Sequence, residues 1–296
     1  MKKVITRLKG GLGNQLFCYA AARRLAFFNG AELVIDDVTG FVRDRLYNRQ
    51  YALGHFHIGA RKATRAERLE PFDRYRRALA KWRSQGKPFL DRSYVEQEGI
   101  DFDARLLQLR VEGTLHLDGL WQSEGYFKDI EQTIREDLRI VPPVDVANRA
   151  LGDEIRSCNA VALHVRWFDT PDGVQSHNAT AAYYRRAIEL MERRMSSPRY
   201  FLFSDDPEAA LAKLGLADRQ VRRVDHNRGD ALAYADLWLM SQCRHFIIAN
   251  STFSWWGAWL STTREKVVLT PAVKLDAKAA WGFAGLIPPN WIEVGA

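Results

Sequence analysis

The sequence lacks several features that mark whole classes of proteins. It has three cysteines among 296 residues, Cys18, Cys158 and Cys243, which are far apart and without metal-ligand spacing. This number and distribution argue against a disulfide framework or a zinc site, and they predict buried free thiols in a reducing compartment. No fixed-period repeat and no low-complexity tract interrupts the chain, so a solenoid and a disordered protein are both excluded.

Long apolar stretches are missing as well. No run of 18 uncharged apolar residues occurs, which predicts that no helix spans a membrane. Charges return within residues 1–7 before an apolar segment develops, so an ordinary signal peptide is not expected. Hydrophobic residues make up 47% and charged residues 27%, as in soluble globular proteins. We therefore expect a cytoplasmic protein with one large or two ordinary domains.

The positive charge of the chain is concentrated in one segment. The net charge is +7, and residues 61–92 alone hold eleven Lys and Arg against four Asp and Glu, while the rest holds 32 of each sign. Residues 66–82 fit a solvated surface helix. The segment equally fits a stretch that rests on anionic lipid at the inner face of the cytoplasmic membrane, with Leu79, Trp82 and Phe89 as anchors. Nucleic acid is a third possibility without a recognisable module.

The order of apolar runs and turns predicts two α/β domains. In the first half we expect a strand over 4–8, a glycine turn over 10–13, a helix over 14–28, a strand over 32–35 and a helix over 128–137. In the second half we expect strands over 160–165, 199–203, 245–249 and 266–269 and helices over 182–195, 230–242 and 254–260. The break at 141–144 sets domains of 1–143 and 144–296, with the last residues packing back on the first domain. Two Rossmann-like domains facing across a cleft, with ligands at the carboxyl ends of strands, follow from this pattern.

The first candidate site is the glycine turn that ends in Asn14. Glycines such as Gly11 and Gly13 let a backbone approach a ligand closely, and a helix that starts there presents free N–H groups. The pattern is neither the dinucleotide fingerprint nor a P-loop. A tight turn in which Asn14 only caps the helix explains these residues equally well.

The second candidate site follows the strand over 160–165, where His164 and Arg166 stand. The planar guanidinium of an arginine at the carboxyl end of a strand suits a bidentate contact with phosphate. A surface ion pair between Arg166 and Asp169 is the alternative interpretation.

A third candidate site lies between a strand and a helix start. It holds an amide and three hydroxyls, Asn250, Ser251, Thr252 and Ser254. Such groups bind anions at helix N-termini, although they often serve only as caps. The adjacent Trp255 and Trp256 are expected to pack in the core.

The sequence does not predict a metal site. Asp205 and Asp206 are adjacent, but no third carboxylate clusters near them, and Asp206 before Pro207 fits a helix cap. We therefore expect neither a metal nor another cofactor. An anionic nucleotide held by one arginine and by helix N-termini is the expected ligand.

Taken as a set, four stretches resemble the bacterial α-1,2-fucosyltransferases of glycosyltransferase family eleven. They are residues 7–17 followed by Tyr19 and Ala20, residues 119–127 with a Trp-Gln-Ser-Glu core, residues 203–206, and residues 236–256. The resemblance implies a GT-B fold and inverting transfer of L-fucose from GDP-β-L-fucose to the 2-hydroxyl of a β-galactoside. It also implies independence of metal and a place in surface glycan synthesis, on an oligosaccharide or lipid-linked glycan such as an O-antigen or capsule precursor.

The resemblance also implies roles for individual residues. His164, Asp205 and Arg166 would lie at the nucleotide, with Arg166 on the β-phosphate. Asp236 would bind guanine, Ser251 and Thr252 would donate to the pyrophosphate, and Asn14 would lie near the reacting centre, with Glu124 a further catalytic candidate. The family usually has a second arginine where this chain has Trp167, which leaves the donor sugar open.

Two questions stay open at this level. For the general base, Glu124, Asp36, Asp37 and His55 are all candidates. For the function, the alternatives are a sister enzyme that uses another hydroxyl or another GDP-sugar, and a non-catalytic nucleotide- or RNA-binding protein, which the sequence pI of about 9.4 would suit.

Overall fold

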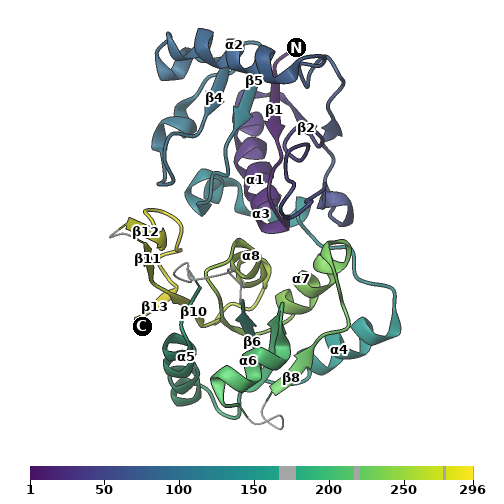
Figure 1. Ribbon diagram of the computed structural model, residues 1–296, viewed down its shortest axis with the longest axis vertical. Coiled ribbons are helices and arrows are strands. Elements are labelled where there is room, and N and C mark those ends of the chain that lie inside the picture. Colours follow the sequence, from purple (N-terminus) through teal and green to yellow (C-terminus); the bar gives the residue numbers. More distant parts are fainter. Residues whose placement is uncertain (167–177, 217–220, 276–277, 296) are drawn as a thin grey trace. The chain divides into compact units, whose positions relative to one another are not determined.

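A computed structural model describes residues 1–166, 178–216, 221–275 and 278–295, and all elements given are those of these ranges (Figure 1). The chain forms two compact units. Unit 1 contains residues 1–139 and 284–286, and unit 2 contains residues 140–283 and 287–296. The division falls between Arg139 and Ile140, four residues before the expected boundary after Pro143. In the described ranges no helix is long and apolar enough to cross a membrane.

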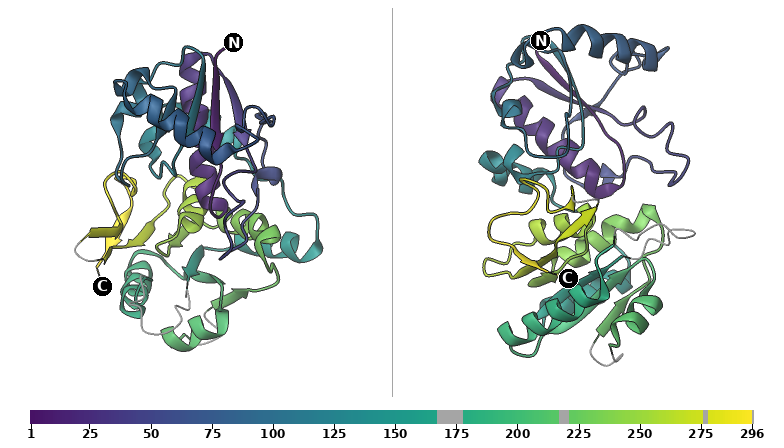
Figure 2. Two further views of the ribbon diagram at one scale, coloured as in Figure 1. Left: turned by 45° about the horizontal axis from the view of Figure 1, so that its top comes forward. Right: turned by 60° about the vertical axis from the view of Figure 1, so that its left-hand side comes forward.

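Unit 1 is built on a parallel sheet with the strand order β3-β2-β1-β5-β4. The strands are β1 (Lys3–Arg7), β2 (Glu32–Asp36), β3 (Arg61–Lys62), β4 (Tyr94–Glu96) and β5 (Thr114–Asp118). The helices are α1 (Leu12–Asn29), α2 (Asp73–Gln85) and α3 (Glu131–Asp137), with 3-10 turns η1 (Leu53–His55), η2 (Phe89–Asp91), η3 (Ala104–Gln108), η4 (Glu124–Tyr126) and η5 (Lys128–Ile130). Figure 2 shows α1 and α2 on opposite faces of this sheet.

Helix α1 forms the core of unit 1. Gly10 has a φ of 73°, a left-handed conformation that glycine adopts readily, and this turns the chain from β1 into the helix. Leu16, Phe17 and Leu25 are buried, and the helix ends at Gly30, which is also left-handed and donates to the carbonyls of the last turn. The first predicted strand and helix are therefore confirmed.

A short return segment completes unit 1. Residues 284–286 belong to it although the residues on either side belong to unit 2. The Phe102 N–H donates to the Ala284 carbonyl at 2.9 Å, and the Ala284 N–H donates to Asp101 Oδ1 at 2.9 Å. Leu286 is fully buried.

Unit 2 contains a larger parallel sheet with the strand order β13-β10-β9-β6-β7-β8. The strands are β6 (Ala160–Val165), β7 (Arg199–Ser204), β8 (Val221–Val224), β9 (His245–Ile247), β10 (Val268–Pro271) and β13 (Ile292–Val294), and β11 (Val273–Leu275) pairs with β12 (Lys278–Trp281) in a separate hairpin. The helices are α4 (Val146–Arg156), α5 (Ala181–Arg194), α6 (Pro207–Leu214), α7 (Ala233–Ser241) and α8 (Thr252–Leu260), and the 3-10 turn η7 (Asp230–Leu232) precedes α7. This strand and helix alternation matches the expected Rossmann-like pattern.

The core of unit 2 follows from its apolar runs. All residues of β6 are buried, as a run without polar alternation predicts for a central parallel strand. Trp255 and Trp256 of α8 are fully buried, so their predicted core role is confirmed. The cysteines are free thiols; Cys18 and Cys243 are buried as predicted, whereas Cys158 is only half-buried.

Candidate functional site

The carboxyl edge of the sheet in unit 2 brings two predicted groups together. Arg166 follows the last residue of β6, and Ser251 stands shortly after the neighbouring strand β9. Arg166 Nη1 donates to Ser251 Oγ at 3.1 Å, so the guanidinium lies at the start of α8. A cation and a helix N-terminus at one strand edge form an environment suited to phosphate.

The other polar residues of this turn have defined places. Ser251 caps α8, because its hydroxyl accepts the Phe253 N–H at 3.3 Å, and Thr252 is the first helical residue. Asn250 Oδ1 accepts the Ala179 N–H at 3.1 Å. The Ser254 hydroxyl is fully buried and donates to the Ser251 carbonyl at 3.3 Å, a hydrogen bond within the first turn of α8.

His164 is a buried and neutral group at the end of β6. Its side chain is 8% exposed, and burial together with the positive charge of Arg166 lowers its pKa to about 3. Within the part of the chain that the structure describes, Nδ1 of this ring has no hydrogen-bond partner. A buried polar atom without a partner is rare in proteins and is available to a ligand.

Asp236 lies in a polar network at the start of α7. Asn227 Nδ2 donates to Asp236 Oδ1 at 2.8 Å, and the same amide also donates to Asn148 Oδ1 at 2.9 Å. Asn148 Nδ2 donates in turn to Asp145 Oδ2, while His226 lies 3.0 Å from Asn148 Oδ1. Burial raises the pKa of Asp236 to about 7, even though the Asn227 bond lowers it. The carboxyl group thus titrates near neutrality.

In unit 1 two distant motifs meet. Gln122 Nε2 donates to Asn14 Oδ1 at 2.8 Å, across 108 positions of sequence. Gly11 is the N-cap residue of α1, and Gly13 lies buried in its first turn. The special backbone conformation falls one residue earlier, at Gly10, where an added Cβ would stand 2.7 Å from Asn14 Nδ2. Glycine at position 10 therefore makes room for the Asn14 amide.

The four candidate bases differ in their surroundings. Glu124 begins η4 and pairs with Lys128 at 3.2 Å, with 13% of its side chain exposed. Asp36 is buried and accepts the N–H groups of Val38 and Thr39, and Asp37 pairs with Lys62 at 2.8 Å. His55 is exposed at the end of η1. Glu124 is the one that shares its segment with Gln122.

The adjacent carboxylates Asp205 and Asp206, which follow β7, have different surroundings. Asp206 caps α6 by accepting the Ala209 N–H at 2.9 Å, as the position before Pro207 suggested. Asp205 is exposed and lies 3.5 Å from the Ser204 hydroxyl. Among the described residues, no group of three or more His, Cys, Asp or Glu could hold a metal ion. Trp167 and Asp169 lie outside the described residues.

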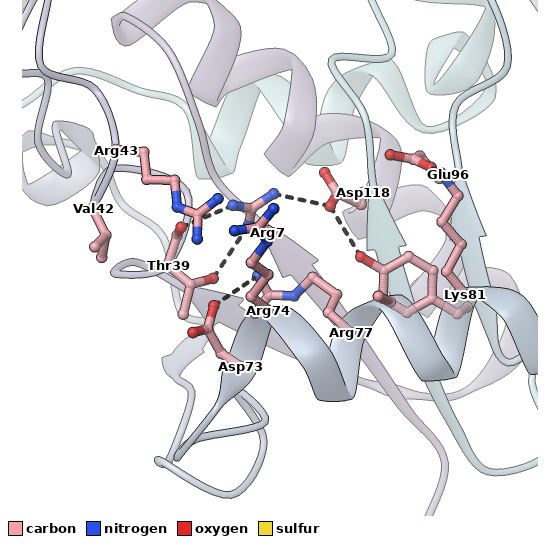
Figure 3. Close-up of a pocket in the computed structure, with 12 residues that line it drawn as sticks. Arg7, Thr39, Val42, Arg43, Asp73, Arg74, Arg77, Lys81, Glu96 and Asp118 are labelled. Carbon is pink, nitrogen blue, oxygen red and sulfur yellow. Dashed lines mark hydrogen bonds and ion pairs between the residues drawn. The ribbon is translucent and has the colours of Figure 1, made fainter.

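A pocket of about 270 Å³ lies in unit 1 between α2 and the carboxyl ends of β1 and β5 (Figure 3). Its lining contains Arg7, Thr39, Val42, Arg43, Asp73, Arg74, Arg77, Ala78, Lys81, Tyr94, Glu96 and Asp118. Asp118, the last residue of β5, is buried and binds Arg7 at 3.0 Å and Lys9 at 2.8 Å. Sequence reasoning did not single out this pocket.

The two Rossmann-like units have the GT-B architecture, as expected. A solved structure of a mutant of FUT1 from Arabidopsis thaliana in complex with GDP shares the fold, with a TM-score of 0.54, 12% identity and coverage of 94% of this chain and 71% of that one.

The family follows from the sequence comparison. The description "Glycosyl transferase family 11" matches residues 3–294, so the chain belongs to this family and is a glycosyltransferase. An alpha-1,2-colitosyltransferase of Escherichia coli is 28% identical over 99% of both chains. The O-antigen biosynthesis glycosyltransferase WbnK of Escherichia coli is 28% identical over 89% of this chain and 92% of its own. A galactoside alpha-(1,2)-fucosyltransferase 1 of Gorilla gorilla gorilla is 23% identical over 85% of this chain and 63% of its own.

Sequence reasoning missed several residues that surround the candidate site. Asn148 and Asn227 are 79 positions apart, and no local pattern joins them to Asp236. Gln122 was part of a quoted motif, but its contact with Asn14 could not be read from spacing. Of the cations that line the pocket, Arg74, Arg77 and Lys81 lie in the segment of excess charge, whereas Arg7 and Arg43 lie outside it.

Proposed function

We propose that this chain transfers L-fucose from GDP-β-L-fucose to the 2-hydroxyl of a β-galactoside, with inversion, during synthesis of a surface glycan. Membership of glycosyl transferase family 11 supports the reaction class. The observation that carries the donor site is the hydrogen bond from Arg166 to Ser251 at the start of α8. This contact supports a diphosphate site, because it brings a guanidinium to the N-terminus of a helix.

In the proposed reaction the acceptor oxygen attacks the anomeric carbon while the bond from that carbon to the GDP oxygen breaks. Negative charge then grows on the leaving diphosphate. Arg166, Ser251 and Thr252 would stabilise that charge, and one donor of this kind is typically worth about 3–4 kcal/mol of the barrier. The neutral His164 ring would add a hydrogen bond from its buried edge to the bound nucleotide without adding charge.

The guanine base would be held by the network at α7. An ionised Asp236 can accept hydrogen bonds from both N1–H and the 2-amino group of guanine. Asn227 donates to that carboxylate at 2.8 Å, and Asn227 is itself held by its 2.9 Å bond to Asn148. Adenine presents an acceptor at N1, so the same carboxylate would select against it.

The acceptor side would lie in unit 1. The Asn14 and Gln122 amides meet next to the glycine turn, and we assign them to positioning the acceptor hydroxyl. Glu124 would take the proton of that hydroxyl as the oxygen attacks, because it lies two residues from Gln122 in the chain and its carboxylate is held by an ion pair with Lys128 at 3.2 Å. We propose that no metal or other cofactor takes part.

A second donor has specific support. The colitosyltransferase of Escherichia coli matches 99% of this chain, and colitose differs from fucose only by lacking the 3-hydroxyl. Purified protein should be incubated with β-galactosides and GDP-fucose, GDP-colitose or GDP-mannose, and the product linkage determined. Transfer of fucose with an α-1,2 linkage at the highest kcat/KM is the expected result. If the protein preferred GDP-colitose, colitose would replace fucose as the proposed donor sugar. If it transferred no sugar from any of these GDP-sugars, the proposal would be overturned.

A further inference from the structure

The pocket in unit 1 has an excess of positive charge. Five of its lining residues are cations and three are acids, which leaves an excess of two. It lies at the carboxyl end of parallel strands, the edge where open α/β sheets bind ligands. Figure 3 shows the guanidinium groups of Arg7, Arg43 and Arg74 directed toward the same space.

Three of the five cations are already paired with carboxylates. Arg7 donates to Asp118 at 3.0 Å, and Lys81 pairs with Glu96. Arg77 is 12% exposed and contacts Asp36 at 3.5 Å and Asp73 at 3.6 Å. These pairs fix the walls of the pocket.

The other two cations have no such partner. Across the described ranges, Arg43 and Arg74 make no ion pair and no side-chain hydrogen bond, although both line the pocket. Guanidinium groups that converge repel one another, and the repulsion is relieved when an anion sits between them. A planar guanidinium fork matches the paired oxygens of a carboxylate or a phosphate.

We infer that this pocket binds an oxyanion, the carboxylate or phosphate of a charged acceptor glycan, through Arg43 and Arg74. This inference rests on the proposed function in one respect, because it identifies the bound anion as part of the acceptor. It gives the acceptor a chemical class, a glycan with an acidic group near the accepting galactose.

The test measures binding apart from transfer. Protein saturated with GDP, so that the phosphate site of unit 2 is filled, is titrated with methyl β-galactoside, its 6-phosphate and methyl β-galacturonide, and binding is followed by NMR. The Arg43→Gln/Arg74→Gln variant is compared with Arg45→Gln/Arg110→Gln, which removes two exposed cations outside the pocket lining.

We expect the charged sugars to bind more tightly than the neutral one and more weakly at high salt. The pocket variant should lose about tenfold or more of that affinity, and the control variant should not. The affinities for the 6-phosphate and for the galacturonide show whether the pocket prefers a phosphate or a carboxylate. Equal binding of neutral and charged sugars, or equal loss in both variants, overturns the inference while leaving transfer from GDP-fucose intact. Failure of transfer with retained anion binding would overturn only the proposed function.

A second inference rests on the outer face of α2. Tyr75, Leu79 and Trp82 are spaced three or four positions apart on α2, so they share one face, and Phe72 precedes the helix as its N-cap residue. The exposed fractions of Phe72, Tyr75, Leu79 and Trp82 are 74%, 72%, 44% and 71%. Only Ser84 of this helix is fully buried. An amphipathic helix ordinarily turns its apolar stripe toward the core, and α2 turns it toward solvent.

Cations flank this stripe. Arg76, Arg83 and Lys87 are exposed, and none of them makes an ion pair within the described residues. Asp73, the one acidic residue of α2, pairs with Arg77 on the inner side. The anchor expected at Phe89 is replaced by Phe72 and Tyr75, since the Phe89 ring is half-buried beneath two guanidinium groups. We propose that this face binds an anionic membrane surface.

Co-sedimentation with anionic and neutral vesicles tests this binding. Each cation near an anionic surface contributes about fivefold in affinity, so Arg76→Gln/Arg83→Gln/Lys87→Gln should weaken binding on the order of 100-fold. Tyr75→Ser/Trp82→Ser should also weaken it, whereas Leu46→Ser, which removes another exposed apolar side chain, should not. Equal binding to neutral and anionic vesicles, or dimer formation through α2 in sedimentation experiments without lipid, overturns the proposal.

Discussion

Replacement of Asp236 by asparagine removes one ionisable group while keeping the oxygen that accepts the Asn227 bond. Burial raises the pKa of Asp236 to about 7 from an ordinary value of 3.8. Guanine presents two donors to this group and therefore requires the ionised form. In the wild type, the affinity for GDP should fall as the pH drops through 7.

The magnitude follows from the population of the ionised form. With a pKa of about 7, roughly nine-tenths of Asp236 is ionised at pH 8 and roughly one-tenth at pH 6, so the apparent affinity for GDP falls about tenfold between them. The Asp236→Asn variant should bind GDP at least about tenfold more weakly at pH 8, since an amide cannot accept both bonds, and it should lack this pH step.

The free energy of unfolding should change with pH in the direction opposite to the affinity for GDP. The folded-state pKa of Asp236 is raised, so its contribution to stability is full below about pH 4 and is lost as the pH rises through 7. The rise spans about three pH units, which corresponds to about 4 kcal/mol. Without nucleotide, Asp236→Asn should therefore be more stable than wild type at pH 8 by up to that amount, and equally stable near pH 4.

Isothermal titration with GDP and ADP at pH 6 and pH 8, together with urea unfolding, measures both effects. ADP carries the same diphosphate, so the ratio of the two affinities removes the titration of the phosphates. A ratio that stays constant with pH in the wild type, or a substitution that weakens GDP and ADP equally, would refute the assignment of guanine to Asp236.

Other predictions follow from the same contacts. Arg166→Ala should abolish transfer with the fold intact by circular dichroism, and Arg166→Lys should restore little of it, because a point charge does not reproduce the fork. Activity should survive EDTA, and loss that magnesium or manganese reverses would reopen a metal role for Asp205. Asp118→Ala should destabilise the protein by about 3 kcal/mol in urea unfolding, because it leaves Arg7 and Lys9 without their shared carboxylate. Burial acts to raise the pKa of Asp118, but Lys9 and Arg7 hold it below the ordinary value, so this contribution is lost as the pH falls below about 4. Asn14→Ala should lower kcat while the Kd for GDP stays unchanged.

Local patterns predicted the repeating part of the fold well. The strand over 160–165 was predicted to the residue, and the helices over 14–28 and 182–195 were placed within two residues, because their apolar periodicity reflects burial in the core. The short strands β3 and β4 were missed, since two or three residues carry no periodic signal.

The candidate site was harder to predict because it depends on contacts between distant segments. The pairing of Asn14 with Gln122 spans 108 positions, and that of Asn148 with Asn227 spans 79. Strand-end motifs could be found one at a time from glycine, arginine and hydroxyl residues. Arg77 and Lys81 of α2 pair with Asp36 and Glu96, respectively. These pairings depend on tertiary packing, which sequence spacing does not predict.

The return of residues 284–286 into unit 1 bears on how the chain folds during synthesis. These residues are synthesised after residues 140–283 of unit 2, so unit 1 receives this segment only after most of unit 2 has been made. Until then the Leu286 site is empty, and Phe102 lacks its backbone partner at Ala284. A ribosome-bound chain that stops near residue 280 should therefore expose unit 1 to proteases and chaperones. The resistance of unit 1 to proteases should rise once residues 284–286 emerge. Completion of unit 1 thus depends on prior synthesis of most of unit 2.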